Sequence, residues 1–323
     1  MRNLKEIQKP IAAEITSFEK KFKQSMQSSV PLLDLITKYL YKQKGKQIRP
    51  MFVFFSAGLC GEINESTYRG ASLVELLHTA SLVHDDVVDD ANERRGLFSI
   101  NALWKNKVAV LVGDFLLAKG LLLSVNNNEL NLLKIVSHAV EQMSEGELLQ
   151  IEKARKLDIK EDIYYEIIRK KTASLIASCC ASGACSVGAS DDVIQKMHLF
   201  GEKVGLAFQI KDDLFDFGLD DIGKPVGNDI KEKKMTLPLI YALNKATTSE
   251  KRHIIRLVKN HNENPEKVAE VIKFVRNSGG LEYATEIMHK YQNEAFEILE
   301  DFPDSEYKTG LHELVKFTTE RNK

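Results

Sequence analysis

Apolar residues recur at helical spacing through most of the chain, and no segment shows the strict alternation of a half-buried strand. From about residue 68 to 89, apolar side chains occupy most of the circumference of a predicted helix, which is typical of the centre of a bundle. No proline lies between Pro50 and Pro225, so this span can be nearly all helix. The sequences DIKE (158–161) and TTSE (247–250) resemble capping boxes that begin further helices.

Loops are expected at 58–66, 89–100 and 218–229, where residues that favour turns cluster. No shift of composition marks a boundary, so the pattern predicts an all-α fold, a large helical bundle that forms a single domain over residues 1–323. The most apolar stretch, 108–125, contains Asp114 and Lys119. Each charge would cost about 2.5–3.5 kcal/mol near the middle of a membrane, so we expect a buried helix there and no transmembrane segment.

Composition narrows the choice of partners. Lys and Arg number 45 against 46 Asp and Glu, and this balance argues against nucleic acid, whose binding requires a basic excess. The cysteines are Cys60, Cys179, Cys180 and Cys185; they lack zinc-site spacing and predict small buried residues of a reduced protein. The N-terminus has no apolar signal-peptide core. We therefore expect a cytoplasmic protein.

The end of the predicted 68–89 helix is unusually acidic. The sequence SLVHDDVVDD (81–90) places Asp85 and Asp89 four residues apart, on one face of a helix and one turn apart. Carboxylate ligands of this kind suit Mg²⁺, which usually shares its coordination shell with substrate phosphates. Considered alone, such a run is more often a solvated helix end.

A second acidic cluster changes that interpretation. FQIKDDLFDF (208–217) repeats the spacing with Asp212, Asp213 and Asp216 among apolar neighbours. Two such clusters on core helices would destabilise the fold without cations, because uncompensated buried charge is costly. The pair predicts two acidic motifs that face each other across a cavity and hold several Mg²⁺ ions around one diphosphate.

Basic residues occur in short motifs that could bind phosphates. They are Lys46 and Arg49 in GKQIRP, Arg94 and Arg95 in NERRG, Lys171 in RKKTASL, Lys224 in GKP and Lys234 in KKMTLP. Any one of them alone is usually a surface charge. As a set they predict diphosphate recognition, since Arg binds phosphate through two N–H groups and Lys acts as a point charge.

Together these motifs resemble the trans-polyprenyl diphosphate synthases of the isoprenoid-synthase family. In the family's order, the matching segments are GKQIRP, ELLHTASLVHDDVVDDANERRG, GDFLLAKG, EGELLQ, KTASL, FQIKDDLFD and GKPVGNDIKEKKMTLP. They span roughly residues 40 to 240. The chain departs from the family in one place: Gly-Gly-Lys-Arg is usual where this chain has Lys44, Gly45, Lys46 and Gln47.

The resemblance implies a prenyltransferase that condenses isopentenyl diphosphate head to tail with an allylic diphosphate, by ionisation, condensation and elimination. Asp85, Asp89 and Asp212 would bind about three Mg²⁺ ions on the allylic diphosphate, with Asp86, Asp213 and Asp216 acting behind them or through water. Arg94, Lys171, Lys224 and Lys234 would bind the same diphosphate, and isopentenyl diphosphate would lie on Lys46, Arg49, His78 and Arg95. Thr172 and Gln209 resemble polar groups beside the cation, and the released diphosphate would take the proton.

Several nearby residues receive a plainer interpretation. Without the resemblance, His78 would be read as a histidine of the core. His84 is interpreted as structural. Asp114 and Glu147 are interpreted as buried hydrogen-bond partners rather than as groups close to the metal.

Product length is predicted from the residues one helical turn before Asp85. Ala80 and Ser81 are small, so a tunnel beneath the metal site would stay open to the level of Leu77. Leu117, Leu121 and Leu122 are candidates for its floor. By family analogy we expect a medium- to long-chain all-trans product of about six to ten isoprene units, with geranylgeranyl diphosphate as the alternative. The small residues would otherwise merely allow close helix packing.

Two other classes of protein remain open. A class I terpene cyclase or a squalene-type synthase shares the fold, but a cyclase would be expected to lack the second aspartate motif and GKQIRP. A non-catalytic subunit of a heteromeric synthase would have lost its aspartates, and here they are present. The resemblance also implies a homodimer.

Overall fold

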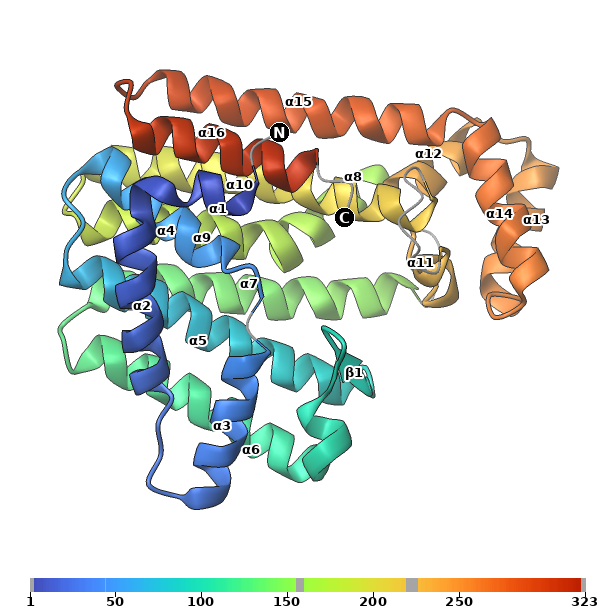
Figure 1. Ribbon diagram of the computed structural model, residues 1–323. Helices are drawn as coiled ribbons and strands as arrows, with labels where there is room; N and C mark the ends of the chain where they lie inside the picture. Colours follow the sequence, from blue (N-terminus) through green and yellow to red (C-terminus); the bar gives the residue numbers. More distant parts are fainter. Residues whose placement is uncertain (1–2, 44, 155–159, 219–225, 321–323) are drawn as a thin grey trace.

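The computed structural model describes residues 3–43, 45–154, 160–218 and 226–320, and this part of the chain is almost entirely helical (Figure 1). The N-terminal elements are α1 (Leu4–Ile7), the 3₁₀ turn η1 (Lys9–Ile11), α2 (Ala12–Ser25), α3 (Pro31–Lys42) and α4 (Ile48–Cys60). The long helices are α5 (Glu65–Val88), α6 (Ile100–Val125), α7 (Leu130–Ala154), α10 (Asp191–Asp216) and α15 (Gly280–Glu300). The predicted all-α fold is confirmed.

Shorter elements complete the bundle. They are the antiparallel strands β1 (Glu93–Arg94) and β2 (Leu97–Phe98), α8 (Glu161–Ile168), the π-helical turn η2 (Arg169–Ala173), α9 (Ser174–Ser186), α11 (Asn228–Lys231), α12 (Leu237–Lys245), α13 (Thr248–Asn260), α14 (Pro265–Asn277) and α16 (Glu306–Thr319). The two strands lie inside the segment 89–100, which the sequence predicts as a loop. Thr247 forms the predicted capping box with Glu250. Asp158 of the other predicted box lies outside the described residues.

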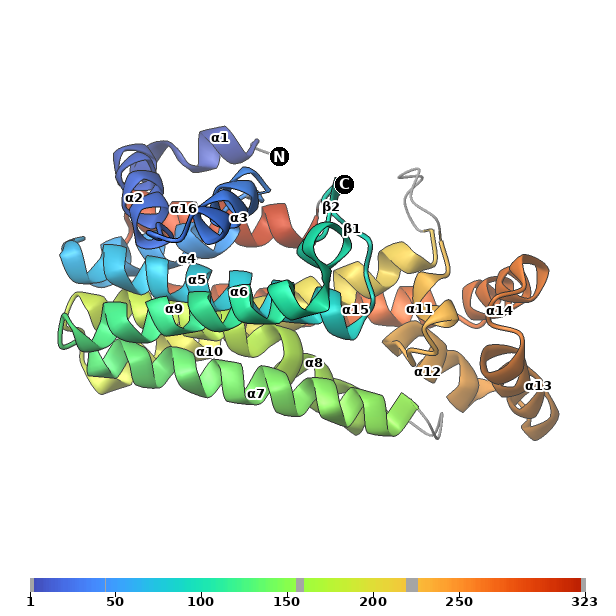
Figure 2. The same ribbon diagram turned by 90° about the horizontal axis from the view of Figure 1, so that it is seen from below.

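The long helices lie alongside one another, and α2 and α3 cross them on one side (Figure 1; Figure 2). Helix α5 packs against α4, α6 and α9, and its apolar residues are buried around most of its circumference, as its pattern predicts. The core has two clusters of buried side chains, one around α4, α5 and α9 and one around the C-terminal half of α10 with α12 to α15. The expectation of a single domain stays a prediction.

Helix α6 differs from the expected buried helix over 108–125. One face packs along α5, where Val112 and Leu116 are buried, but Leu111, Leu121 and Leu122 on the opposite face are exposed. Within the described residues, α6 is the helix whose length and composition would allow it to cross a membrane. The outer apolar face of α6 is therefore not covered by any other described segment of the chain.

The two helices that carry the acidic motifs are each followed by a residue with a left-handed φ, and carbonyls at each helix end accept hydrogen bonds. After α5, Asp90 adopts a left-handed φ of 50° and the Ala91 N–H donates to the Asp86 carbonyl, which is the arrangement of a Schellman cap. After α10, Gly218 has a φ of 68°, and Arg276 of α14 donates to the carbonyls of Phe217 and Gly218. Both acidic motifs are thus held at helix C-termini, at the same end of the bundle (Figure 1).

Candidate active site

Three adjoining cavities lie among α5, α7, η2 and α10. The largest, the central cavity, has a volume of about 550 Å³ and is mainly apolar. The lysine pocket, of about 190 Å³, shares Lys171 and Thr172 with the central cavity. The arginine pocket, of about 40 Å³, shares His78 with it. A polar pocket therefore adjoins the apolar cavity on each of two sides.

The first acidic motif divides between two of these cavities. Asp85 lines the central cavity, where partial burial raises its pKa and the carboxylates of Glu147 and Asp89 raise it further. Asp89 is the C-cap residue of α5. Asp86 is buried in the arginine pocket, and its Oδ1 lies 2.7 Å from Nε and 2.6 Å from Nη2 of Arg94. Arg94, predicted to bind the allylic diphosphate, is thus held by Asp86.

The second acidic motif is more deeply placed. Asp213 lines the lysine pocket and accepts hydrogen bonds from Tyr164 at 2.6 Å and from Gln209 at 2.9 Å. Burial raises its pKa to about 8, and the negative charge of Asp229 adds to the rise. Asp216 instead accepts the backbone N–H groups of 228 and 229 at 2.8 and 3.1 Å, which ties α11 to the end of α10. Asp212 is half-buried on the same helix.

The acidic motifs fit a divalent cation. Both lie at helix C-termini, where the helix dipole is negative and carboxylates are unfavourable, and neither α5 nor α10 has a basic residue in its last turn. Burial raises the pKa of Asp85 and of Asp213, and neighbouring carboxylates raise it further, so a bound cation would relieve repulsion at both residues. Among the described residues no three acidic, histidine or cysteine side chains form a ready-made metal cage, and Mg²⁺ usually takes only one or two carboxylates together with substrate phosphates.

Lysines from two elements reach the same region. Lys171 of η2 lies 2.5 Å from Glu147 of α7, and Lys234 is paired with Glu232 and lies 3.6 Å from Asp229. Burial alone would lower the pKa of Lys234, but its acidic partners outweigh burial and raise it. Both lysines line the lysine pocket. Lys224 lies outside the described residues.

A glycine sets the distance between α7 and η2. A Cβ at Gly146 would lie 2.8 Å from the backbone nitrogen of Lys171 and 2.9 Å from the Cβ of Lys170. Such contacts are shorter than van der Waals packing allows, so only glycine permits this approach. The approach brings Lys171 to Glu147, and a π-helical turn such as η2 is itself frequent at functional sites.

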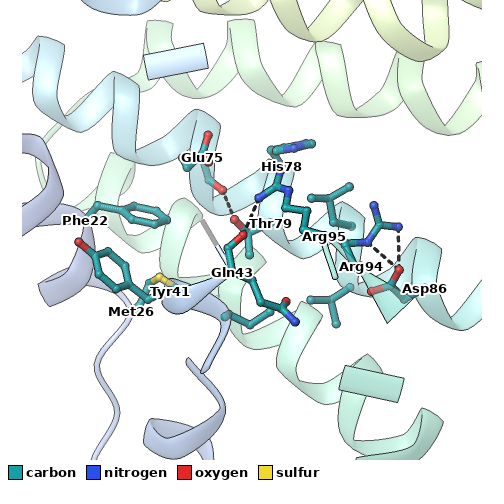
Figure 3. Close-up of a pocket in the computed structure, with 13 residues that line it drawn as sticks. Phe22, Met26, Tyr41, Gln43, Glu75, His78, Thr79, Asp86, Arg94 and Arg95 are labelled. Atoms are coloured by element: carbon teal, nitrogen blue, oxygen red, sulfur yellow. Dashed lines mark hydrogen bonds and ion pairs between the residues drawn. The ribbon is translucent and has the colours of Figure 1, made fainter. Parts of the chain in front are cut away.

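On the other side of the central cavity, buried polar atoms lack partners. Among the described residues, Nε of Arg49, Nδ1 of His78 and Oε2 of Glu75 are buried without a hydrogen bond. Burial lowers the pKa of His78 well below its usual value, and the charges of Arg49 and Arg95 lower it further, so the ring is neutral. Figure 3 shows Glu75, His78 and Arg95 side by side in the arginine pocket. Of these atoms, the unpaired N–H of Arg49 is a buried donor that suits an anionic ligand, whereas an ionised Glu75 carboxylate can only accept hydrogen bonds.

Two further contacts shape this side. Arg95 donates from Nη1 to the carbonyl of Gln43 at 2.8 Å, and its guanidinium packs so closely on Gly45 that a Cβ there would lie 2.8 Å from its Cζ. Lys46 lies over the ring of Phe317 of α16, 5.3 Å from its centroid. The predicted residues for isopentenyl diphosphate therefore come from the α3–α4 connection, α4, α5 and the hairpin.

The predicted product tunnel corresponds to the central cavity only in part. Ser81 and Leu117 line it, whereas Ala80 and Leu77 are fully packed, with Leu77 against Gly120 of α6. The floor predicted at Leu121 and Leu122 is wrong, because both lie on the exposed outer face of α6. The apolar wall comes instead mainly from α4, α7, α9 and α10, through Phe52, Val140, Met143, Leu175, Ile176 and Phe208.

Some residues at the site were not predicted to act there. Glu147 and His84 line the central cavity, and Asp114, predicted to be buried, is 60% exposed and 3.5 Å from His84. Tyr164 and Glu75 line the two polar pockets. Glu75 could have been found from its spacing three residues before His78, which places it on the same helix face, but Tyr164 gives no such signal.

The chain is similar to known prenyl synthases along its whole length. Residues 30–275 match the family model described as polyprenyl synthetase. The chain is 36% identical to the all-trans-nonaprenyl-diphosphate synthase (geranyl-diphosphate specific) of Rhodobacter capsulatus, covering 97% of this chain and 96% of that protein. It is 33% identical to the heptaprenyl diphosphate synthase component 2 of Bacillus subtilis (strain 168), covering 95% and 88%.

Solved structures show the same fold. A polyprenyl synthase from Caulobacter crescentus CB15, complexed with calcium and isoprenyl diphosphate, is 31% identical with a TM-score of 0.91, covering 99% of this chain and 98% of that one. A geranylgeranyl pyrophosphate synthase from Bacteroides thetaiotaomicron is 37% identical with a TM-score of 0.83, covering 98% of each chain. The similarity thus includes proteins named for products of different length.

Proposed function

The chain belongs to the polyprenyl synthetase family and is a trans-prenyltransferase, and from that premise we propose that the three cavities bind an allylic diphosphate, isopentenyl diphosphate and the growing chain. The spatial arrangement of the three cavities is the main support for this assignment. The lysine pocket and the arginine pocket each adjoin the central cavity through shared residues, Lys171 and Thr172 on one side and His78 on the other. Two anionic groups can therefore lie on either side of one apolar space.

The allylic diphosphate belongs in the lysine pocket. Lys171 and Lys234 would stabilise the negative charge that develops on the departing diphosphate, which is electrostatic catalysis at the leaving group. Asp85, Asp89 and Asp212 would hold Mg²⁺, which when bound neutralises the same charge. The calcium and isoprenyl diphosphate in the relative from Caulobacter support a divalent metal at such a site. The number of ions, about three by resemblance, is part of this proposal.

Isopentenyl diphosphate belongs on the arginine side. Arg49, His78 and Arg95 would bind its diphosphate, with the unpaired N–H of Arg49 as one buried donor, and Lys46 would add a further positive charge. Its double bond would then face the central cavity and attack the allylic cation. The apolar wall excludes water that would quench that cation. The released diphosphate, held next to the cation, would accept the proton that is lost.

For product length we propose a medium- to long-chain polyprenyl diphosphate rather than geranylgeranyl diphosphate. The support is the size of the central cavity, about 550 Å³, and the small residue Ser81 in its wall one turn from Asp85. The nonaprenyl and heptaprenyl relatives agree with this proposal. The geranylgeranyl synthase from Bacteroides supports the alternative, so chain length has to be measured.

For assembly we propose a homodimer that pairs the outer faces of α6. Leu103, Val110, Leu111, Leu121, Leu122 and Val125 are exposed on that face and recur at helical spacing. An exposed apolar stripe of this length marks an interaction site. The name of the Bacillus relative, component 2, makes a heteromeric partner the alternative occupant.

We also propose a cytoplasmic location. All four cysteines are free, and Cys179 and Cys180 are buried. Free thiols fit a reducing compartment. Recovery of the protein mainly in secreted or membrane fractions of its own cells would contradict this location.

Incubation of the purified chain with labelled isopentenyl diphosphate, Mg²⁺ and each allylic primer in turn tests the function. We expect elongated all-trans products from the chain alone. A requirement for a second polypeptide would support the non-catalytic subunit, and a cyclic hydrocarbon made from one diphosphate would support the terpene cyclase.

A further inference from the structure

A chain of three hydrogen bonds runs through the wall between the lysine pocket and the central cavity. Tyr164 of α8 donates from its hydroxyl to Asp213 Oδ2 at 2.6 Å. Gln209 of α10 donates from Nε2 to Asp213 Oδ1 at 2.9 Å. Thr172 of η2 donates from Oγ1 to Gln209 Oε1 at 2.8 Å. The chain joins three elements and ends at a residue that lines both cavities.

The chemistry of these groups fixes the direction of the chain. A carboxylate oxygen accepts hydrogen bonds, so Gln209 must turn its NH₂ group to Asp213 and its carbonyl oxygen to Thr172. The Thr172 hydroxyl then has to donate, because an amide oxygen has no hydrogen to give. The only hydrogen of that hydroxyl is therefore used in the bond to Gln209, and only the oxygen lone pairs remain to face a ligand in the cavity.

Tyr164 preserves this direction because it keeps Asp213 Oδ2 engaged. The Tyr164 hydroxyl occupies Oδ2 and fixes the rotation of the carboxyl group, so that Oδ1 faces Gln209 and accepts from its NH₂ group. Tyr164 and Asp213 are each 4% exposed, so no bulk water competes for these positions.

We propose that Tyr164 is a positioning residue that acts through Asp213 and Gln209 to make the Thr172 hydroxyl present only lone pairs to the allylic cation. This inference rests on the proposed function. Oxygen lone pairs stabilise a neighbouring positive charge, whereas a hydroxyl hydrogen turned into the cavity would oppose it. The orientation exists before the substrate ionises, and preorganisation of this kind is what lowers a barrier.

Tyr164→Phe tests the inference, because it keeps the ring and removes the hydroxyl. We expect kcat to fall by about tenfold to hundredfold while KM for both substrates changes by less than about threefold. The matched control is Tyr165→Phe, whose hydroxyl donates to Glu161 at 3.0 Å. Tyr165 is not among the residues that line the three cavities, so this variant should keep kcat within about twofold of the parent.

A double-mutant cycle separates positioning from a general structural effect. If Tyr164 acts through Thr172, the Tyr164→Phe change should lower kcat by less than about twofold in a Thr172→Val background, because the oriented hydroxyl is already gone. An equal loss in both backgrounds would overturn the proposal, as would parent-like kcat in Tyr164→Phe. If Tyr164→Phe does not fold, Gln209→Met breaks the same chain from α10 and enters the same cycle with the same criteria.

A parent chain that makes no prenyl product would defeat the proposed function. A parent and a Tyr165→Phe variant that are both active, together with an unaffected Tyr164→Phe variant, would defeat only the role of Tyr164.

Discussion

At the scale of single residues, the site contains charges that are unfavourable for the fold by itself. Asp85 and Asp89 lie at the negative end of α5, where burial raises the pKa of Asp85 and the carboxylates of Glu147 and Asp89 raise it further. A charged side chain that lies where its charge is unfavourable is typical of a functional site. Here the role we assign is to hold a divalent cation.

Replacing Asp85 by Asn should therefore remove activity without unfolding the protein. The substitution keeps the shape of the side chain and removes the charge that a cation needs. We expect kcat to fall about 1000-fold, roughly 4 kcal/mol of transition-state stabilisation, with the thermal midpoint unchanged or raised because a repulsion is relieved. Asp90→Asn is the matched control, since Asn tolerates the left-handed φ of 50° at that position. Equal activity of the two variants would contradict the metal role, as would full activity of the parent in excess EDTA.

A second residue-scale prediction concerns Ser81, which lines the central cavity one turn from Asp85. Ser81→Phe should fill that space and shorten the product, while the rate of each condensation stays near that of the parent. Ser81→Ala, which removes the hydroxyl without adding bulk, should leave the product length unchanged. Chromatography of the products compares the three proteins, and an unshortened product from Ser81→Phe would place the limit of the tunnel elsewhere.

The sequence predicts the identity of the charged residues better than their pairing. Spacing and resemblance together identify Asp85, Asp213 and Lys171, and the structure brings them to adjoining cavities. The pairing of Arg94 with Asp86 and the hydrogen bond from Tyr164 to Asp213 were not predicted. Such contacts depend on how helices distant in sequence are rotated against each other, which periodicity does not specify.

At the scale of elements, the close approach of α7 and η2 decides where Lys171 lies. The sequence predicts a helix through this region but gives no sign of a π-helical turn, which depends on one extra residue in a helical turn. From the sequence, EGELLQ is identified only as a motif that resembles the family. The structure explains why its second residue is a glycine: a Cβ at Gly146 would lie too close to the backbone of Lys171.

Gly146→Ala should for that reason destabilise the protein and misplace Lys171. A Cβ 2.8 Å from the Lys171 nitrogen forces α7 and η2 apart, and overpacking of this kind costs about 1–3 kcal/mol. We expect a lower thermal midpoint and a higher KM for the allylic diphosphate, with KM for isopentenyl diphosphate little changed.

The same change at another helical glycine should have the opposite sign. At Gly70 a Cβ would lie 3.5 Å from Leu132, an ordinary contact, and Ala is favoured over Gly within a helix by about 0.5–1 kcal/mol. Gly70→Ala should therefore keep or raise the thermal midpoint. Differential scanning calorimetry compares the two variants, and a Gly146→Ala protein as stable and active as Gly70→Ala would contradict the steric role.

At the scale of the whole molecule, the sequence correctly predicts the helical class, but the prediction that residues 108–125 are buried is wrong for the outer face of α6. The stretch 108–125 is expected to be buried because it is apolar, yet its outer face is exposed in the chain. Composition cannot tell a helix buried in its own chain from one that is covered by a second molecule. The apolar outer face of α6 therefore fits the dimer that we propose, although its composition alone predicts a helix of the core.

Leu111→Glu should separate the proposed dimer. Leu111 is 59% exposed in the single chain, so a charge there costs little in a monomer but would be buried without a partner in a dimer. Sedimentation velocity should show a dimer for the parent and a monomer for the variant. Leu199→Glu, at an exposed leucine of α10, is the control and should stay dimeric. A parent that sediments as a monomer, or a Leu111→Glu protein that remains a dimer, would contradict this interface.

If two diphosphate pockets serve one apolar cavity, the purified chain must join both substrates, and analysis of its products is the decisive measurement. The purified parent chain and its Asp85→Asn variant are each incubated with Mg²⁺, labelled isopentenyl diphosphate and each allylic primer in turn, farnesyl diphosphate among them. We predict that the parent converts the label into an all-trans polyprenyl diphosphate longer than geranylgeranyl diphosphate and that the variant does not. A parent that leaves isopentenyl diphosphate unreacted with every allylic primer would contradict the account.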